Sequence, residues 1–117
     1  MNNQYNATTV TVSASASLSS VYDNSEGITS GIVIPSALEA TTKLAFYVCD
    51  IVDGTYVPLY DTSNVLIEIT VAVNAARAYP VPEQLKLWPY IKIWTEASGS
   101  NVTQTADRVF TFMSLRA

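Results

Sequence analysis

The segment from Lys43 to Tyr60 constrains the fold more than any other stretch of the sequence. Apolar residues at every second position from Leu44 to Val48 are typical of a strand with one face in a core. Asp53-Gly54 follows as a turn signal, since this dipeptide readily supplies the positive φ of a hairpin turn. Residues 55–60 provide the return strand. The pattern predicts a β-hairpin at the centre of an all-β domain.

The same alternation predicts further strands along the chain. Residues 65–73 (VLIEITVAV) are the longest alternating run and predict the longest strand. A single helical turn is expected at 82–88, because proline is tolerated at the first helical position. The remaining strands are expected at residues 8–14, 18–22, 28–34, 78–81, 90–96 and 107–115. About eight or nine short strands at this spacing favour an antiparallel β-sandwich or a jelly-roll-like fold.

The length of 117 residues leaves room for one domain. We expect residues 1–20 to form an N-terminal arm with the first strand, and residues 8–117 to form a single β-sandwich domain. Residues 1–7 are polar and are expected to be frayed, so the arm is a candidate for ordering on assembly.

Charged residues make up 14% of the sequence, against about 25% in an average protein. The surface must therefore be built largely from neutral polar side chains, which cost little to desolvate and suit a face that packs against another protein. The net charge is −4 and the six basic residues are dispersed, so we expect no nucleic-acid partner. No apolar run approaches the roughly 18 residues of a membrane helix, so we expect no membrane partner.

Two features favour synthesis in the cytoplasm. The N-terminal sequence has neither the basic region nor the apolar core of a signal peptide. The single cysteine, Cys49, excludes an internal disulfide.

The sequence offers little support for enzymatic chemistry. It has no histidine, which is the usual general base near neutral pH and the commonest metal ligand. Cys49 lies inside a predicted strand and is interpreted as a buried structural thiol. The remaining candidates are catalytic carboxylate pairs among Asp50, Asp53, Asp61 and Glu68, or a calcium site built from Asp50, Asp53 and Asp61. Turns explain Asp53 and Asp61, and the spacing matches no calcium loop. We expect no enzymatic activity, no metal and no cofactor.

The aromatic residues are the best candidates for a binding surface. Trp94 shares a strand face with Lys92 and Glu96, so it is either partly covered by a loop or an anchor for a partner. The tyrosines that can join this surface are Tyr47, Tyr56, Tyr60, Tyr79 and Tyr90. Two alternatives are an aromatic platform that holds a sugar, and Trp88 with Trp94 as caps at the two ends of the core.

Glu68 and Arg108 are the charged candidates. Glu68 interrupts one face of the predicted strand at 65–73. This face is therefore either exposed to solvent or paired with another chain across an interface. Arg108 begins the last predicted strand and is expected to pair with Glu68 or Glu96 across strands, or to lie at a subunit contact. The predicted protein-contact residues are Trp94, Lys92, Glu68, Tyr47 and Arg108.

Five short motifs occur in a recognisable order. They are GIVIPSAL at 31–38, TKLAFYV at 42–48, DGTYVPLYD at 53–61, LWPYIKI at 87–93 and QTADR at 104–108. This order resembles a group of small structural proteins encoded near the capsid genes of tailed bacteriophages, over roughly residues 28–115. The chain departs from the family pattern at two places. The family has a shorter polar link where this chain has Cys49–Val52, and the family has a basic strand end where this chain has Ile93–Thr95.

The resemblance implies a virion component that is made in the host cytoplasm and located on the capsid surface. Its implied function is that of a cement or decoration protein, bound to the outside of the head through protein–protein contacts. The implied partners are the major capsid protein and further copies of the chain itself, as a homodimer or homotrimer. A neck or tail component and a carbohydrate-binding module on a phage appendage are the alternatives.

Overall fold

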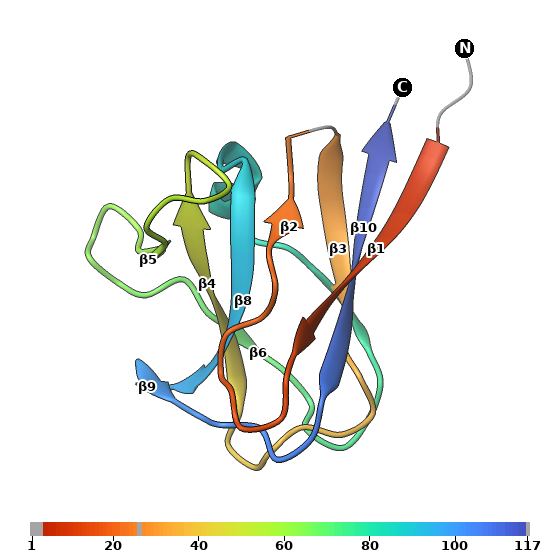
Figure 1. Ribbon diagram of the computed structural model, residues 1–117, viewed down its shortest axis with the longest axis vertical. Coiled ribbons are helices and arrows are strands. Elements are labelled where there is room, and N and C mark those ends of the chain that lie inside the picture. The colour runs from red at the N-terminus through yellow and green to blue at the C-terminus, as the bar shows by residue number, and fades with distance from the viewer. Residues whose placement is uncertain (1–3, 26, 117) are drawn as a thin grey trace.

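The computed structural model describes residues 4–25 and 27–116, and it consists of two antiparallel sheets stacked as two layers (Figure 1). The first sheet has the spatial order β1 (Gln4–Val12), β10 (Arg108–Arg116), β3 (Ile28–Val33) and β7 (Ala78–Pro80). The second has the order β2 (Tyr22–Asp23), β8 (Tyr90–Ala97), β4 (Lys43–Cys49) and β5 (Val57–Pro58). The strand β6 (Ile69–Thr70) pairs with β4, and β9 (Ser100–Asn101) pairs with β8. The predicted all-β antiparallel sandwich is confirmed.

The core lies between the two sheets and follows the alternation of the sequence. Phe110 and Phe112 of β10 point inward, toward Phe46 of β4 and Ile91 and Ile93 of β8, and all five are fully buried. Each large apolar side chain that is removed from water in this way contributes about 1.5–3 kcal/mol to folding. Tyr22 closes one side of the core by stacking on Phe112, with ring centroids 4.1 Å apart. These contacts make the sandwich a rigid support for its outer faces.

Most predicted elements occur where expected. The strands predicted at 28–34, 43–49, 78–81, 90–96 and 107–115 correspond to β3, β4, β7, β8 and β10 within about two residues. The predicted helical turn is a 3₁₀ helix, η1 (Glu83–Leu87), which follows Pro82. The first strand begins at Gln4, and its whole length pairs with β10. Residues 4–7 are therefore part of the sheet, while residues 1–3 of the expected arm lie outside the described residues.

The prediction of a long strand at 65–73 is wrong. Within this run only Ile69 and Thr70 form a strand, paired with Leu44 and Lys43 at the start of β4, and Leu66 makes an isolated bridge with Tyr60. The far end of the same β4 edge is already taken by the hairpin return, where β5 pairs with Tyr47 and Val48. The alternation still reports burial, because Ile67 and Val71 contribute to the core although neither belongs to a strand.

The hairpin is present, but the reason given for its glycine is wrong. Gly54 does not adopt a positive φ; Gly99 is the glycine with this conformation in the described chain, at φ 81°. A Cβ atom on Gly54 would lie 2.5 Å from the Cys49 sulfur and 2.7 Å from Ile51 Cγ1. The glycine is therefore required by the close return of the loop over β4.

Candidate functional site

The outer face of the second sheet carries a cluster of aromatic side chains around Lys92. Tyr47 and Lys92 are direct neighbours across β4 and β8. The Lys92 ammonium lies 4.6 Å from the centre of the Tyr56 ring, a cation–π geometry. The edge of Tyr47 meets Trp94, with centroids 5.1 Å apart. We call Tyr47, Tyr56, Tyr90, Lys92 and Trp94 the aromatic face.

Trp94 is buried beneath the other side chains of the aromatic face. Only 5% of the residue is accessible, and its indole N–H donates a hydrogen bond of 2.7 Å to Asn101 Oδ1 on β9. The interpretation of Trp94 as partly covered by a loop is therefore right, while its interpretation as an exposed anchor is wrong. Trp88 is half-buried and packs against the core, which agrees with the alternative in which it caps the core.

An exposed apolar loop adjoins the aromatic face. The connection from β4 to β5 exposes Ile51 by 60% and Val52 by 47%, and Val57, the first residue of β5, is 51% exposed. The Tyr56 hydroxyl donates a hydrogen bond of 2.8 Å to the Val52 carbonyl oxygen and so attaches this loop to the aromatic face. We call residues 51–57 the apolar loop. The sequence pattern assigned Asp53-Gly54 to a turn and residues 55–60 to a return strand, and the exposed side chains of this segment were missed, although Ile51-Val52 beside Asp-Gly is an unusual apolar pair for a turn.

Glu68 and Glu96 form a carboxyl pair at the opposite end of the same outer face. Glu96 has no accessible area, and its Oε1 accepts a hydrogen bond of 2.8 Å from the Gly99 N–H. Its buried Oε2 finds no donor among the described residues. Burial raises the pKa of Glu96 to about 7, and a hydrogen bond with Glu68 and the charge of Glu68 add to this increase. Lys43 Nζ lies 4.0 Å from Glu68. Near neutral pH a substantial fraction of Glu96 is therefore protonated and uncharged beside Glu68.

Arg108 does not pair with Glu68 or Glu96, and that expectation is wrong. Its guanidinium lies 3.4 Å from Glu39 and 3.2 Å from Gln104, and its side chain is only 15% exposed. The Thr105 hydroxyl bonded to Glu39, together with the charge of Arg108, holds the pKa of that carboxyl below its usual range. Asp107 accepts a hydrogen bond of 2.8 Å from the Ala14 N–H. The QTADR motif thus connects the start of β10 to the loop that carries Glu39 and to Ala14 after β1.

Gln104, which sequence analysis did not single out, is the centre of that network. It is fully buried, and its Nε2 donates to Thr42 Oγ1 at 3.2 Å and to the Val102 carbonyl at 3.1 Å. Its Oε1 accepts from the Glu39 N–H at 3.0 Å. A buried glutamine with this many partners ties the 39–42 loop to the loop that leads into β10.

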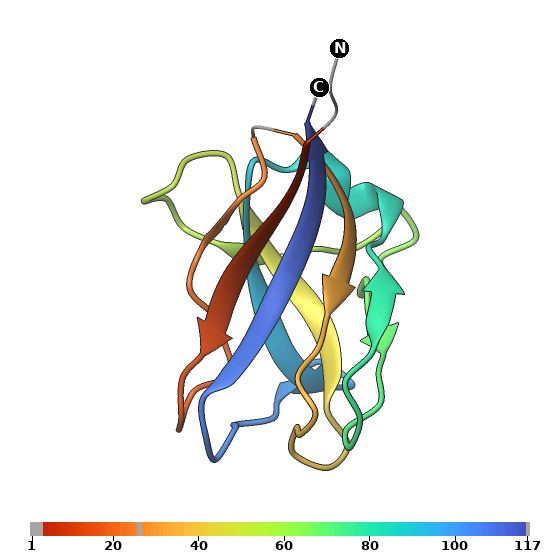
Figure 2. The same ribbon diagram turned by 90° about the vertical axis from the view of Figure 1, so that its right-hand side faces the viewer.

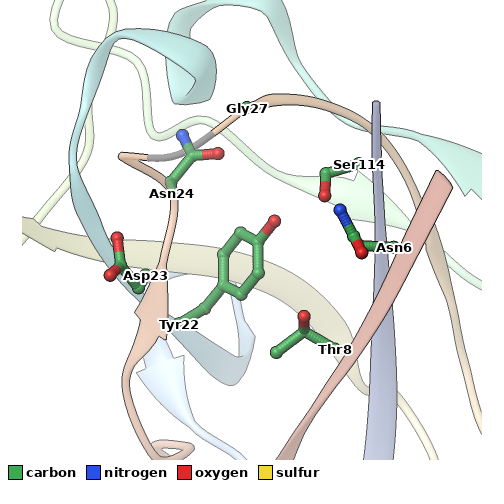
Figure 3. A pocket seen from close by; sticks show the side chains of 7 residues that line it. All are labelled: Asn6, Thr8, Tyr22, Asp23, Asn24, Gly27 and Ser114. Atoms are coloured by element: carbon green, nitrogen blue, oxygen red, sulfur yellow. The ribbon is translucent and has the colours of Figure 1, made fainter. Parts of the chain in front are cut away.

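A polar pocket of about 140 Å³ opens between β1 and β2 (Figure 3). Tyr22 and Asn24 form its inner wall; the Tyr22 hydroxyl is bonded to Thr29 at 2.7 Å, and Asn24 Nδ2 to the Trp88 carbonyl at 2.9 Å. The Nδ2 atom of Asn6 is buried at its rim and has no partner among the described residues. Its lining residues are Asn6, Thr8, Tyr22, Asp23, Asn24, Gly27 and Ser114. The pocket has room for a few water molecules or one small hydroxylated group.

The carboxylates considered for metal binding or catalysis either have structural hydrogen-bond partners or do not lie close enough to one another to form a metal site. Asp61 accepts hydrogen bonds from the Ser63 and Val65 N–H groups at 2.8 and 3.0 Å, as its turn predicts. Cys49 is buried, as expected for a structural thiol. In the described part of the chain, no three histidine, cysteine or acidic side chains come close enough to hold a metal ion. No helix within residues 4–25 and 27–116 is long and apolar enough to cross a bilayer.

Comparison with known proteins adds no assignment to these features. No protein-family model matches this chain, and no curated protein or solved structure matches it at a significant level.

Proposed function

We propose that this chain is a non-enzymatic structural protein of a tailed-phage virion, which binds the outside of the capsid and stabilises it. The order of its five motifs supports this proposal, and so does a rigid sandwich with little charge on its surface. The observation that carries it is the apolar loop beside the aromatic face. Exposed aliphatic and tyrosine side chains on a rigid support are typical of protein–protein contacts.

The proposed mechanism is binding energy alone. Ile51 and Val52 gain about 1.5–3 kcal/mol each when a partner covers them fully. Tyr47 and Lys92 on the aromatic face, with Lys92 beside Tyr56 of the loop, offer groups that accept or donate hydrogen bonds to a partner. A protein that spans neighbouring capsid subunits in this way raises the work needed to separate them. The sequence-predicted contacts at Tyr47 and Lys92 belong to this surface, with Trp94 beneath it and Glu68 at its far end.

A binding experiment tests the proposal. Capsids that lack the protein are mixed with purified chain and sedimented, and the bound fraction is measured. We expect the double variant Ile51→Ser/Val52→Ser to lose most of the binding without loss of stability, because both side chains are exposed. Val65→Ser is the matched control, since Val65 is 57% exposed on a different loop. Failure of the unmodified chain to bind, or an equal loss with Val65→Ser, contradicts the proposal.

The polar pocket favours a second candidate, a carbohydrate-binding module on a phage appendage. Its Asn, Asp, Thr and Ser groups are those that bind sugar hydroxyls, and Asn6 Nδ2 has no partner in the described structure. A glycan array distinguishes the two functions: binding that is lost in Asn6→Ala supports this candidate, and the absence of any bound glycan contradicts it. Trp94→Ala is a poor probe of sugar binding, because Trp94 is buried.

A further inference from the structure

The sandwich has four sheet margins, and three of them are protected against pairing with another chain. The strands β2 and β5 have two residues each, β7 has three, and prolines occupy β5 and β7 at Pro58 and Pro80. Short strands and prolines are common means of blocking an edge. The fourth margin is β1, which has nine residues, Gln4–Val12, and neither a proline nor a charged residue. Figure 2 looks onto this sheet and shows β1 as its free margin.

The hydrogen bonds of β1 show which backbone groups are free. Near the end of β1, the backbone groups of Thr11 point away from β10. The Thr11 carbonyl accepts a hydrogen bond from the Ser20 N–H at 3.1 Å, and the Thr11 N–H donates one to Ser20 Oγ at 3.2 Å. Because backbone groups on one edge recur at every second residue, Tyr5, Ala7 and Thr9 also point outward. These three residues are exposed, and no partner occupies their outer groups in the described structure.

We propose that β1 pairs with β1 of a second copy of this chain, antiparallel about a two-fold axis at Ala7. This register uses all the free groups: Ala7 lies opposite Ala7 of the second copy, and Tyr5 lies opposite Thr9. The two four-stranded sheets become one continuous sheet of twice the size. The inference names a surface for the self-association that the proposed function includes, but it holds or fails without any capsid.

The sequence of β1 suits this occupant. A symmetric antiparallel pair places residue 7 against its own copy, where like charges would repel, and the strand has no charge anywhere along its length. Alanine at the axis leaves room for close approach. Tyr5, which is 74% exposed, gains a cross-strand neighbour in Thr9 of the second copy. A two-fold pair is closed, so it predicts a dimer and excludes a trimer through this edge.

Cysteine cross-linking of the full chain tests the register. In Ala7→Cys, the two Cα atoms lie about 5.5 Å apart across the axis, within the range of a disulfide. In Tyr5→Cys, the corresponding atoms lie about 14 Å apart, at about 3.4 Å per residue. Under mild oxidation we expect Ala7→Cys to form a covalent dimer and Tyr5→Cys to remain single chains. The unmodified chain controls for Cys49, which is buried. Equal cross-linking of both variants overturns the proposed register.

Sedimentation equilibrium tests the interface itself. We expect the unmodified chain to be a dimer, and Ala7→Lys and Ala7→Glu each to be monomeric but still to unfold in one cooperative transition, because residue 7 is exposed within the single chain. An equimolar mixture of these two variants restores a dimer, since opposite charges then meet at the axis. Val109→Lys is the matched control; it changes an exposed residue of the adjacent strand and leaves the dimer intact. A monomeric unmodified chain, a trimer, or a dimer that survives both charged variants overturns the proposal.

Discussion

The Glu96→Gln substitution tests whether a buried carboxyl pair makes folding depend on pH. Burial, with a further contribution from Glu68, raises the pKa of Glu96 from 4.5 to about 7. A tenfold change in proton affinity is worth about 1.4 kcal/mol, so this difference corresponds to about 3 kcal/mol of folding free energy. Between these pH values the folded chain binds a proton that the unfolded chain has released. The free energy of unfolding therefore falls as pH rises from 4.5 to 7, and it stays lower above pH 7.

Urea unfolding at pH 5 and pH 8 measures this effect. The chain has no histidine, so few other side chains titrate in this interval. The unmodified protein is expected to be less stable at pH 8 than at pH 5 by up to about 3 kcal/mol. Glutamine at position 96 keeps an acceptor for the Gly99 N–H and donates to Glu68, as the protonated acid does. Glu96→Gln should therefore remove most of the difference, whereas Glu83→Gln, at an exposed side chain, should not. Equal stability of the unmodified protein at both pH values refutes the reasoning.

Three further substitutions test the core, the buried network and the turn, all by urea unfolding at pH 5. Phe112→Ala removes a fully buried ring stacked on Tyr22 and should cost about 3–5 kcal/mol; a loss below about 1 kcal/mol would mean that the two sheets do not pack through this ring. Gln104→Leu leaves the Glu39 N–H without its acceptor and removes one of the two donors to the Val102 carbonyl, so it should cost about 2 kcal/mol, and an unchanged midpoint contradicts the network. Gly99→Ala should cost about 1 kcal/mol through its positive φ alone, since nothing lies near an added Cβ; no loss means that the turn has another conformation.

The alternation of apolar residues was sufficient to predict the strands that carry the core. Ile91 and Ile93 point inward and Lys92 and Trp94 outward, as the period of two requires. Strand pairing could not be predicted in the same way. Residues 65–73 alternate as well as any strand in the chain, but the hairpin return occupies the far end of the β4 edge and leaves only its start for Ile69 and Thr70. The whole fold decides which segment pairs with a given sheet edge, and a local sequence pattern does not contain this information.

The candidate surfaces were predictable only in part. Tyr47 and Lys92 lie on the outer face as expected, because their strand faces follow from the pattern. The burial of Trp94 and Glu96 depends on β9, which folds back over the end of β8. Arg108 was assigned to the wrong partner for a similar reason, since the loop that carries Glu39 approaches it from a distant part of the sequence.

We propose that this chain acts by adhering to a capsid as a component of the particle. Quantitative mass spectrometry of purified phage particles measures it directly, as the number of copies of this chain relative to the major capsid protein. A decoration protein predicts copy numbers comparable to those of the capsid protein, whereas a neck or tail component predicts far fewer. Absence of the chain from particles, together with its presence in infected cells, would contradict the claim.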